Sequence, residues 1–347
     1  MHMADALISP AVGGVMLVAT AGTMAYSIKK IKYEGDDKKI PLMGVMGAFV
    51  FAAQMINFSI PGTGSSGHLG GGLLLAILLG PYRAFITMAS ILLIQCLFFA
   101  DGGILAYGCN VFNMAFYGCF IAYLLIYKNI IKETISTKKI FIASIVASII
   151  GLQMGAFSVV IETLLSGRTE LPFGTFVVLM QPIHLAIGIV EGIVTGAIIA
   201  FIWKENPAIL DMASKEKSID KGDMKGILIK LMIAVIIVGG ALSWFASSNP
   251  DGLEWSMIKT AGTAELETEE KVHENFGNIQ KKTAILPDYN FKSSEEAEEN
   301  NQEDTWPAVN IGTSISGLIG GAMTLILAMI MGIIIKKTKK NNKNIEG

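Results

Sequence analysis

Apolar runs of about 20 residues recur along this chain, and they constrain its fold more than any other feature. A helix needs about 20 such residues to cross a hydrocarbon core about 30 Å thick. Apolar residues make up 52% of the chain and charged residues 16%, which is typical of a protein with several membrane-spanning helices. We therefore predict an all-α polytopic membrane protein.

The apolar runs predict nine helices, seven in a first group and two more nearer the carboxy terminus. The third is short and rich in glycine, so we expect it to be broken or re-entrant. A bilayer tolerates such a segment only where protein or a cavity satisfies its backbone. The predicted helices cover residues 7–28, 40–60, 68–80, 82–100, 103–127, 139–165, 176–203, 226–246 and 308–335.

Lysines and one arginine gather in alternate loops and at the carboxy terminus, and the positive-inside rule assigns these segments to the cytoplasm. The amino terminus and the loop before His68 then lie outside, and the carboxy terminus lies inside, in the inner membrane of a prokaryote. Asp5 and the lack of a basic leading segment argue against a cleavable signal. The basic residues are Lys29, Lys30, Lys32, Lys38, Lys39, Arg83, Lys128, Lys132, Lys138, Lys139, Lys204, Lys215, Lys217, Lys221, Lys225, Lys336, Lys337, Lys339, Lys340 and Lys343.

Residues 247–307 form the predicted extracytoplasmic loop, and they hold fourteen Asp or Glu against five Lys. We expect residues 290–305 to be solvated and partly disordered. His273 is expected to be solvated as well. Residues 249–255 have turn chemistry directly after a helix and predict an ordered element.

The first two residues predict metal binding together with a distant histidine. The amine of Met1, the backbone nitrogen of His2 and the His2 imidazole can close adjacent chelate rings around a small divalent cation. His68, in the glycine-lined run 61–72, would complete a plane of four nitrogens. Such ligation indicates Ni(II), Cu(II) or Co(II) and not Zn(II) or Mg(II). The alternative is that His2 lies in a frayed terminus without a role.

Other polar residues in or beside the helices are candidates to support these ligands. Gln95 can hydrogen-bond a histidine ligand or pair with a neighbouring helix. Asp101 and Asn110 can act in the same way, although capping the outer end of a helix is the simpler interpretation. His184 and Glu191 are seven residues apart and share a helix face, at about 10 Å along the axis. Ionisable residues at membrane depth are functional candidates, but this pair can also be satisfied by other helices.

Several distinctive motifs follow one another at wide spacing along the chain. They are the opening Met-His-Met-Ala-Asp-Ala-Leu-Ile-Ser-Pro, Gly67-His68-Leu69, Gln95 with Asp101-Gly102-Gly103, Asn110 with Asn113-Met114, and Pro250-Asp251-Gly252-Leu253-Glu254. Up to about residue 205 these motifs resemble the CbiM/NikM family, the substrate-binding (S) components of energy-coupling-factor cobalt and nickel transporters. The segment from about 225 onward resembles a NikN-type accessory component fused to the first part.

The resemblance implies a seven-helix S-component bundle over residues 1–205, a cytoplasmic linker over 206–225, and a NikN-like part over 226–347. It implies that Met1, His2 and His68 bind Co(II) or Ni(II), which is the transported substrate and not a cofactor. Nitrogen ligands suit both metals, so the sequence does not decide between them. The expected partners are a transmembrane coupling subunit, ATP-binding cassette ATPases and membrane lipid, and no nucleic acid is expected.

These features favour metal capture for an ATP-driven importer. The sequence has no phosphate-binding Gly-x-x-x-x-Gly-Lys-Ser/Thr loop, so the ATPase must be another subunit. An intramembrane metalloenzyme built on His184 and Glu191 is the alternative from a different class. The missing His-Glu-x-x-His motif and a metal site without an open position weaken it, and we predict that the chain is not an enzyme. A passive metal channel is a third possibility, which a tight closed chelate disfavours.

Overall fold

A computed structural model describes residues 1–34, 39–132, 135–205, 221–268, 270–291, 307 and 309–343. The chain is mostly helical, which confirms the predicted fold class. The exception is a two-stranded antiparallel hairpin, β1 (Phe58–Ile60) and β2 (Ser65–Gly67), which the sequence reading missed. The predicted linker and acidic stretch fall largely on residues 206–220 and 292–306, which lie outside the described residues.

Six helices of the described residues are long and apolar enough to cross a membrane, whereas nine were predicted. The six are α1 (Pro10–Glu34), α4 (Pro81–Phe99), the continuous segment of α5 (Tyr107–Val111), η3 (Phe112–Tyr127) and α6 (Lys128–Ile131), then α7 (Thr137–Leu165), α8 (Phe173–Glu205) and α13 (Ile311–Lys343). The other three predicted helices are present with shorter apolar lengths. They are α2 (Ile40–Gln54), α3 (Gly72–Leu79) and α10 (Lys221–Gly240).

Helix α3 is short because a glycine ends the helical backbone on each side of it. Gly71 has φ +80° and Gly80 has φ +82°, conformations that side chains other than glycine rarely adopt. Pro81 then starts α4 at once, because its fixed φ suits the first turn of a helix. Eight residues span about 12 Å, well short of the bilayer, and all of them are buried in protein. This burial is what a short segment at membrane depth requires.

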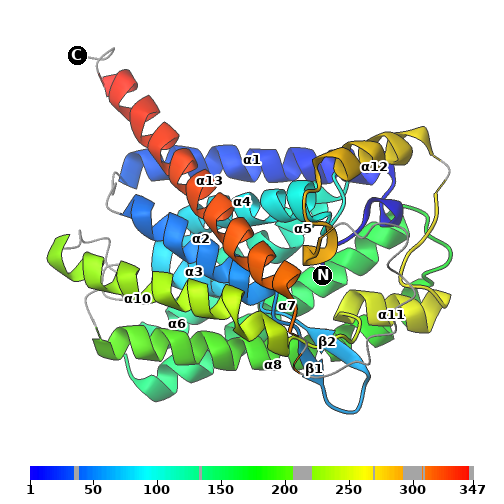
Figure 1. Ribbon diagram of the computed structural model, residues 1–347, viewed down its shortest axis with the longest axis horizontal. Coiled ribbons are helices and arrows are strands. Elements are labelled where there is room, and N and C mark those ends of the chain that lie inside the picture. The colour runs from blue at the N-terminus through cyan, green and yellow to red at the C-terminus, as the bar shows by residue number, and fades with distance from the viewer. Residues whose placement is uncertain are drawn as a thin grey trace.

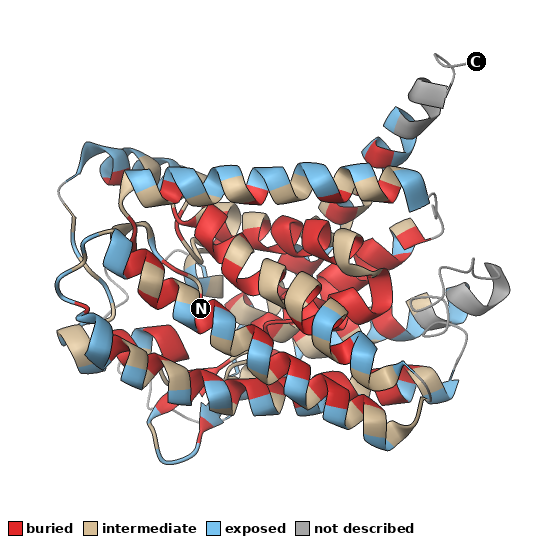
Figure 2. Ribbon diagram, turned by 180° about the vertical axis from the view of Figure 1, so that it is seen from behind, coloured by how far each residue is buried: buried red, intermediate tan, exposed pale blue. Residues whose placement is uncertain are grey.

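The helices lie roughly side by side, and α4 runs through their middle (Figure 1). Of the 18 residues that form the most apolar stretch of α4, 78% are buried, against 17% for the corresponding stretch of α1. Buried residues accordingly concentrate in the centre of the molecule, while the outer helices present exposed faces (Figure 2). Those exposed faces are rich in Ile, Leu and Val, which suits contact with lipid.

The carboxy-terminal part packs on the first group of helices. Helices α10 and α13 lie against α2, which brings them into the same bundle. Between them the chain forms η4 (Leu242–Phe245), α11 (Gly252–Ala261), α12 (Lys271–Thr283) and η5 (Pro287–Tyr289). Helices α11 and α12 and the hairpin lie at one end of the bundle, and the carboxy-terminal end of α13 lies at the opposite end (Figure 1).

Helix α11 begins at a complete capping box. The Asp251 side chain accepts from the backbone N–H groups of Leu253 and Glu254, and the Glu254 side chain accepts from the Asp251 N–H. These bonds satisfy donors that the first turn of a helix would otherwise leave free. The prediction of an ordered element at 249–255 agrees with this structure.

The expectation that His273 is solvated is wrong. Its side chain is 3% exposed, and its Nε2 lies 2.8 Å from the carbonyl oxygen of Ile8. Helix α12, which carries it, has one apolar face and covers the first residues of the chain. Acidic composition indicated a solvated loop, but it does not reveal an amphipathic helix that packs through one face.

Candidate metal site

The amino terminus is buried in the bundle and is not frayed. Met1 is 6% exposed, Met3 is 0% exposed, and Leu7 lies in the same apolar cluster. Asn110 holds the backbone of Met3 through both of its side-chain atoms. Its Oδ1 accepts from the Met3 N–H at 2.7 Å, and its Nδ2 donates to the Met3 carbonyl at 3.0 Å. The interpretation of His2 as part of a disordered end therefore does not apply.

The turn at Asp101-Gly102-Gly103 gives the amino-terminal segment its place. Gly102 has φ +81°. A methyl group at Gly103 would lie 1.9 Å from Oδ1 of Asp5, so only glycine fits there. The Gly103 N–H also donates to the Met3 carbonyl at 2.9 Å. The predicted turn is present, and it packs directly against Met3 and Asp5.

His68 follows β2 directly and faces the chain start. Its Nε2 lies 3.3 Å from the nitrogen of Met1. Its Nδ1 lies 3.2 Å from the carbonyl oxygen of Leu69, which places the ring proton on Nδ1 and a lone pair on Nε2. The rings of His2 and His68 stack with centroids 5.1 Å apart. The sequence separated these residues by more than sixty positions, and the structure brings all three together.

Two of the predicted supporting residues contact the His2 ring. Its Nε2 lies 3.2 Å from Oε1 of Gln95, and its Nδ1 lies 3.3 Å from Oδ1 of Asp101. Nε2 of Gln95 in turn donates to Oε1 of Gln54 on α2, a contact that sequence reasoning missed. Gln54 also donates to the carbonyl of Gly70 at 2.9 Å, which links the support of His2 to the segment that follows His68.

The surroundings lower the pKa of both imidazoles and so favour the neutral form, which is the form that binds a metal. Burial, and then the positive charge of the Met1 ammonium, lower the pKa of His2 from 6.5 to about 3. Burial and the same ammonium lower the pKa of His68 to about 3 as well. Burial raises the pKa of Asp101, which accepts a hydrogen bond from Tyr289. Tyr289 comes from η5, so the carboxy-terminal part contributes to this surrounding.

Asp251 also reaches the site, and the sequence analysis did not predict this. Its Oδ2 lies 2.9 Å from the Met1 nitrogen and 4.0 Å from Nε2 of His68. Burial alone would raise the pKa of Asp251, but the Met1 ammonium and His68 lower it below its usual range. The contact joins residues 250 positions apart, and a local motif gives no sign of such a pairing.

His184 and Glu191 do not form a pair. Nδ1 of His184 donates to the Met180 carbonyl, and its Nε2 is buried without a hydrogen-bond partner among the described residues. Glu191 accepts from the backbone N–H groups of Gly70 and Gly71 at 2.9 and 3.1 Å. Glu191 therefore fixes the backbone beyond His68, which is a structural role.

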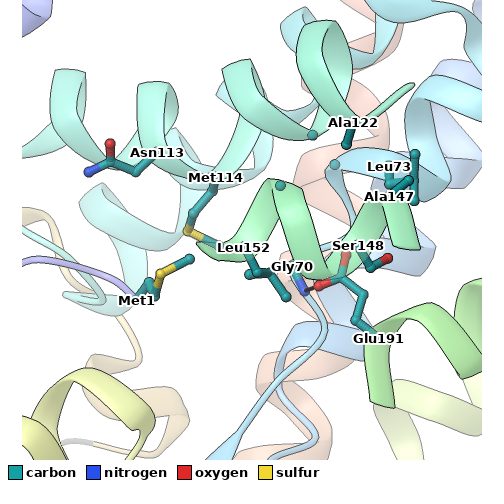
Figure 3. A pocket seen from close by; sticks show the side chains of 13 residues that line it. Met1, Gly70, Leu73, Asn113, Met114, Ala122, Ala147, Ser148, Leu152 and Glu191 are labelled. Atoms are coloured by element: carbon teal, nitrogen blue, oxygen red, sulfur yellow. Dashed lines mark hydrogen bonds between the residues drawn. The ribbon is translucent and has the colours of Figure 1, made fainter. Parts of the chain in front are cut away.

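Two small cavities adjoin the site. One is lined by Met1, His68, His184 and Asp251. The other is lined by Met1, Asn113 and Glu191, and Figure 3 shows Met1 and Glu191 on its wall with Gly70 hydrogen-bonded to Glu191. Within the described residues no group of three or more His, Cys, Asp or Glu side chains is arranged to hold a metal ion. The predicted site is of a different kind, because it uses two imidazoles and two backbone nitrogens.

Residues 2–209 match the family model of CbiM, described as the cobalt uptake substrate-specific transmembrane region. The chain belongs to the CbiM family. Residues 225–337 of this CbiM-family chain match a second model, the PDGLE domain. The resemblance predicted from the spaced motifs, including the fusion to a NikN-like part, is confirmed.

Relatives of this CbiM-family chain include other fused proteins. The chain is 31% identical over 335 residues to a putative fused nickel transport protein NikMN of Archaeoglobus fulgidus, which covers 95% of this chain and 98% of the relative. It is 29% identical to a probable fused nickel transport protein LarMN of Lactiplantibacillus plantarum, over 74% of this chain and 78% of the relative. A crystal structure of a truncated transition metal transporter matches with a TM-score of 0.52 and 32% identity, over 59% of this chain and 99% of that one.

The family is a component of metal transporters and not an enzyme, as predicted. The metalloenzyme alternative built on His184 and Glu191 therefore has no support from the family, and the two side chains bind different partners in the structure. The six apolar helices and the transporter relatives together indicate a multi-pass membrane protein.

Proposed function

We propose that this protein captures Co(II) or Ni(II) from outside the cell and delivers it inward as the substrate-binding component of an energy-coupling-factor importer. The ligands in this proposal are the Met1 amine, the His2 backbone nitrogen, the His2 imidazole and the His68 imidazole. The observation that carries the proposal is the 3.3 Å separation of the Met1 nitrogen and Nε2 of His68, in a buried site with neutral imidazoles.

The chemistry of these four nitrogens suits a small divalent ion. Met1 and His2 are adjacent, so the amine, the amide nitrogen and the imidazole form fused chelate rings around one metal, and His68 supplies the fourth position. Square-planar nitrogen ligation favours Ni(II), Cu(II) and Co(II), and selection between these relies on geometry and availability because affinity alone favours Cu(II). The ring nitrogen closest to the backbone, Nδ1 of His2, must leave Asp101 to bind the metal.

Support for the outward orientation comes from charge and from the fold. The lysine-rich carboxy-terminal ends of α1 and α13 lie at the opposite end of the bundle from the hairpin that directly precedes His68 (Figure 1). The positive-inside rule assigns the lysine-rich end to the cytoplasm, so the site opens to the outside. A coupling subunit and ATP-binding cassette ATPases would supply the energy, because the sequence has no phosphate-binding loop of its own.

The test is metal binding by purified protein with three glycines added before Met1, beside the His2→Ala and His68→Ala variants. We expect each change to reduce Ni(II) and Co(II) affinity at least a hundredfold, because each substitution removes an imidazole and the extension converts the Met1 amine into an amide and separates the free amine from His2 and His68. Three glycines added after Gly347 are the matched control. Intact mass should show a retained, unblocked Met1. Undiminished binding by the amino-terminally extended protein would contradict the proposal.

The coupling to ATP is tested separately in cells. Metal uptake should require coexpression of the coupling subunit and the ATPases. Replacing the lysine in the phosphate-binding loop of the ATPase should abolish uptake. Full uptake by this chain alone would instead indicate a passive channel.

A further inference from the structure

The carboxylate of Asp251 links the fused carboxy-terminal part to the proposed metal ligands. Oδ2 of Asp251 accepts from the Met1 ammonium at 2.9 Å, and the two groups are 15% and 5% exposed. No other salt bridge to the terminal amine occurs among the residues that the structure describes. The contact is therefore a largely buried charge pair between the first residue and the PDGLE segment, residues 250–254.

The two oxygens of Asp251 serve different partners. Oδ1 accepts from the N–H groups of Leu253 and Glu254 at 2.8 and 2.9 Å, which caps α11. Oδ2 faces the Met1 nitrogen. The cap fixes the side-chain rotamer, so Oδ2 is held in position before any metal arrives. A helix cap alone needs only the first oxygen, and serine or asparagine would provide it equally well.

The backbone around Asp251 is fastened to the strand that precedes His68. Ser66 donates its N–H to the Pro250 carbonyl at 2.8 Å and its hydroxyl to the Asn249 carbonyl at 2.7 Å. The Trp255 indole N–H donates to the Thr63 carbonyl at 2.9 Å. Asp251 and His68 therefore follow two backbone segments that are hydrogen-bonded to each other, and these hydrogen bonds fix the distance between the Asp251 carboxylate and the His68 imidazole.

The charge of Asp251 matches the site in both of its states. Without metal, the ammonium (+1) and the carboxylate (−1) cancel. With metal, a divalent ion and one deprotonated amide nitrogen together carry +1, which the Asp251 carboxylate again offsets. An unbalanced charge in a buried site is costly. A coordinated amine also keeps two N–H bonds, so Oδ2 can accept from it in the loaded site too.

We propose that Asp251 is a positioning residue of the metal site, which holds the Met1 amine beside His68 and neutralises the loaded site. Through Asp251, the fused carboxy-terminal part thus completes a capture site whose metal ligands all come from the first part of the chain. This inference depends on the proposed function, because it assumes that the Met1 amine binds the metal.

The test compares Asp251→Ser and Asp251→Asn with Glu254→Gln as the matched control. The first two keep an N-cap for α11 and remove the negative oxygen beside Met1. The control removes a carboxylate three residues away, and glutamine still serves the capping box. We expect Asp251→Ser and Asp251→Asn to lose about ten- to hundredfold in Ni(II) affinity, the worth of one charged hydrogen bond. The control should lose less than threefold.

Two further measurements separate positioning from a general structural role. The visible absorption of the Ni(II) complex should keep its four-nitrogen band in Asp251→Ser, because Asp251 does not bind the metal in this proposal. Formate, which can occupy the space of the missing carboxylate, should restore affinity to Asp251→Ser, whereas chloride at the same ionic strength should not.

Three results would overturn the inference. They are unchanged affinity in Asp251→Ser, an equal loss in Glu254→Gln, and a shifted absorption band that makes Asp251 itself a ligand. The proposed function fails differently, since the amino-terminal glycine extension would then leave binding by the otherwise native chain intact. If the extension abolishes binding and the Asp251 variants bind normally, only the present inference is wrong.

Discussion

Replacing Asn110 by alanine should weaken metal binding without touching a ligand. The Met3 N–H is buried and donates to Oδ1 of Asn110 at 2.7 Å, so the variant leaves this donor without its partner. The Met3 carbonyl keeps the hydrogen bond from Gly103. One orphaned buried donor costs about 1–3 kcal/mol. Since this segment carries His2, the cost falls on the conformation that presents the amine and the imidazole.

The expected loss in Ni(II) affinity follows from that free energy. A cost of 1–3 kcal/mol corresponds to about a 5- to 150-fold larger dissociation constant, because every 1.4 kcal/mol changes it tenfold. The whole loss appears in binding only if metal-free Asn110→Ala releases its amino terminus. Isothermal titration of purified protein in detergent measures the affinity, and proteolysis or hydrogen exchange at residues 1–9 measures the release.

Asn129→Ala is the matched control, because Asn129 is exposed and donates only to the carbonyl of its own helix at Leu125. Its affinity should equal that of the unmodified protein. Unchanged affinity in Asn110→Ala would refute the reasoning that anchoring of Met3 prepares the site. Complete loss of binding with a normal melting temperature would also refute this reasoning, because loss of the Met3 anchor alone should raise the dissociation constant by no more than about 150-fold.

Three further changes test other parts of the structure. Acidification should destabilise the metal-free protein, because both imidazoles have a pKa of about 3 when folded and about 6.5 when unfolded. The free energy of unfolding therefore decreases as the pH is lowered from 6.5 to 3, by ~2 kcal/mol for each imidazole at pH 5. Melting curves of His2→Ala should show a smaller decrease over the same pH range. Gly103→Ala should displace the first residues, because its methyl group would lie 1.9 Å from Asp5, and Ni(II) binding should fall at least tenfold; normal binding would contradict the close packing. Glu191→Ala leaves two buried backbone N–H groups without an acceptor and should cost ~2–6 kcal/mol, seen as a lower melting temperature, whereas an unchanged melting temperature would show that these bonds are replaced.

The sequence could predict where the most apolar helices form but not how long each one is. Hydropathy identifies apolar runs, and all nine predicted segments contain a helix. Hydropathy does not show where a glycine interrupts the helical backbone, as Gly71 and Gly80 do. Helix α3 was therefore predicted to start at residue 68, whereas it starts at residue 72. The hairpin before His68 was missed for a similar reason, because its strands have only three residues each.

The candidate ligands could be named from chemistry and resemblance, but their surroundings could not. Coordination chemistry singles out Met1, His2 and His68 because three of the four nitrogens are adjacent in the chain. Nothing local in the sequence reveals that Asp251 meets Met1 or that His273 meets Ile8, contacts that join residues 250 and 265 positions apart. Such pairings depend on tertiary packing, and a single sequence contains no direct record of it.

The hydrogen bonds between Ser66 and the 249–250 backbone have a consequence for why the two parts share one polypeptide. On separate chains, this contact would form only as often as the two proteins met in the membrane, and its occupancy would depend on their abundance. Within one chain the second partner is always present, because its effective concentration is set by the covalent connection and not by the abundance of a separate protein. Covalent fusion thus keeps the partners of the Ser66 hydrogen bonds beside His68 close together at any protein concentration, and it fixes the ratio of the two parts at one to one.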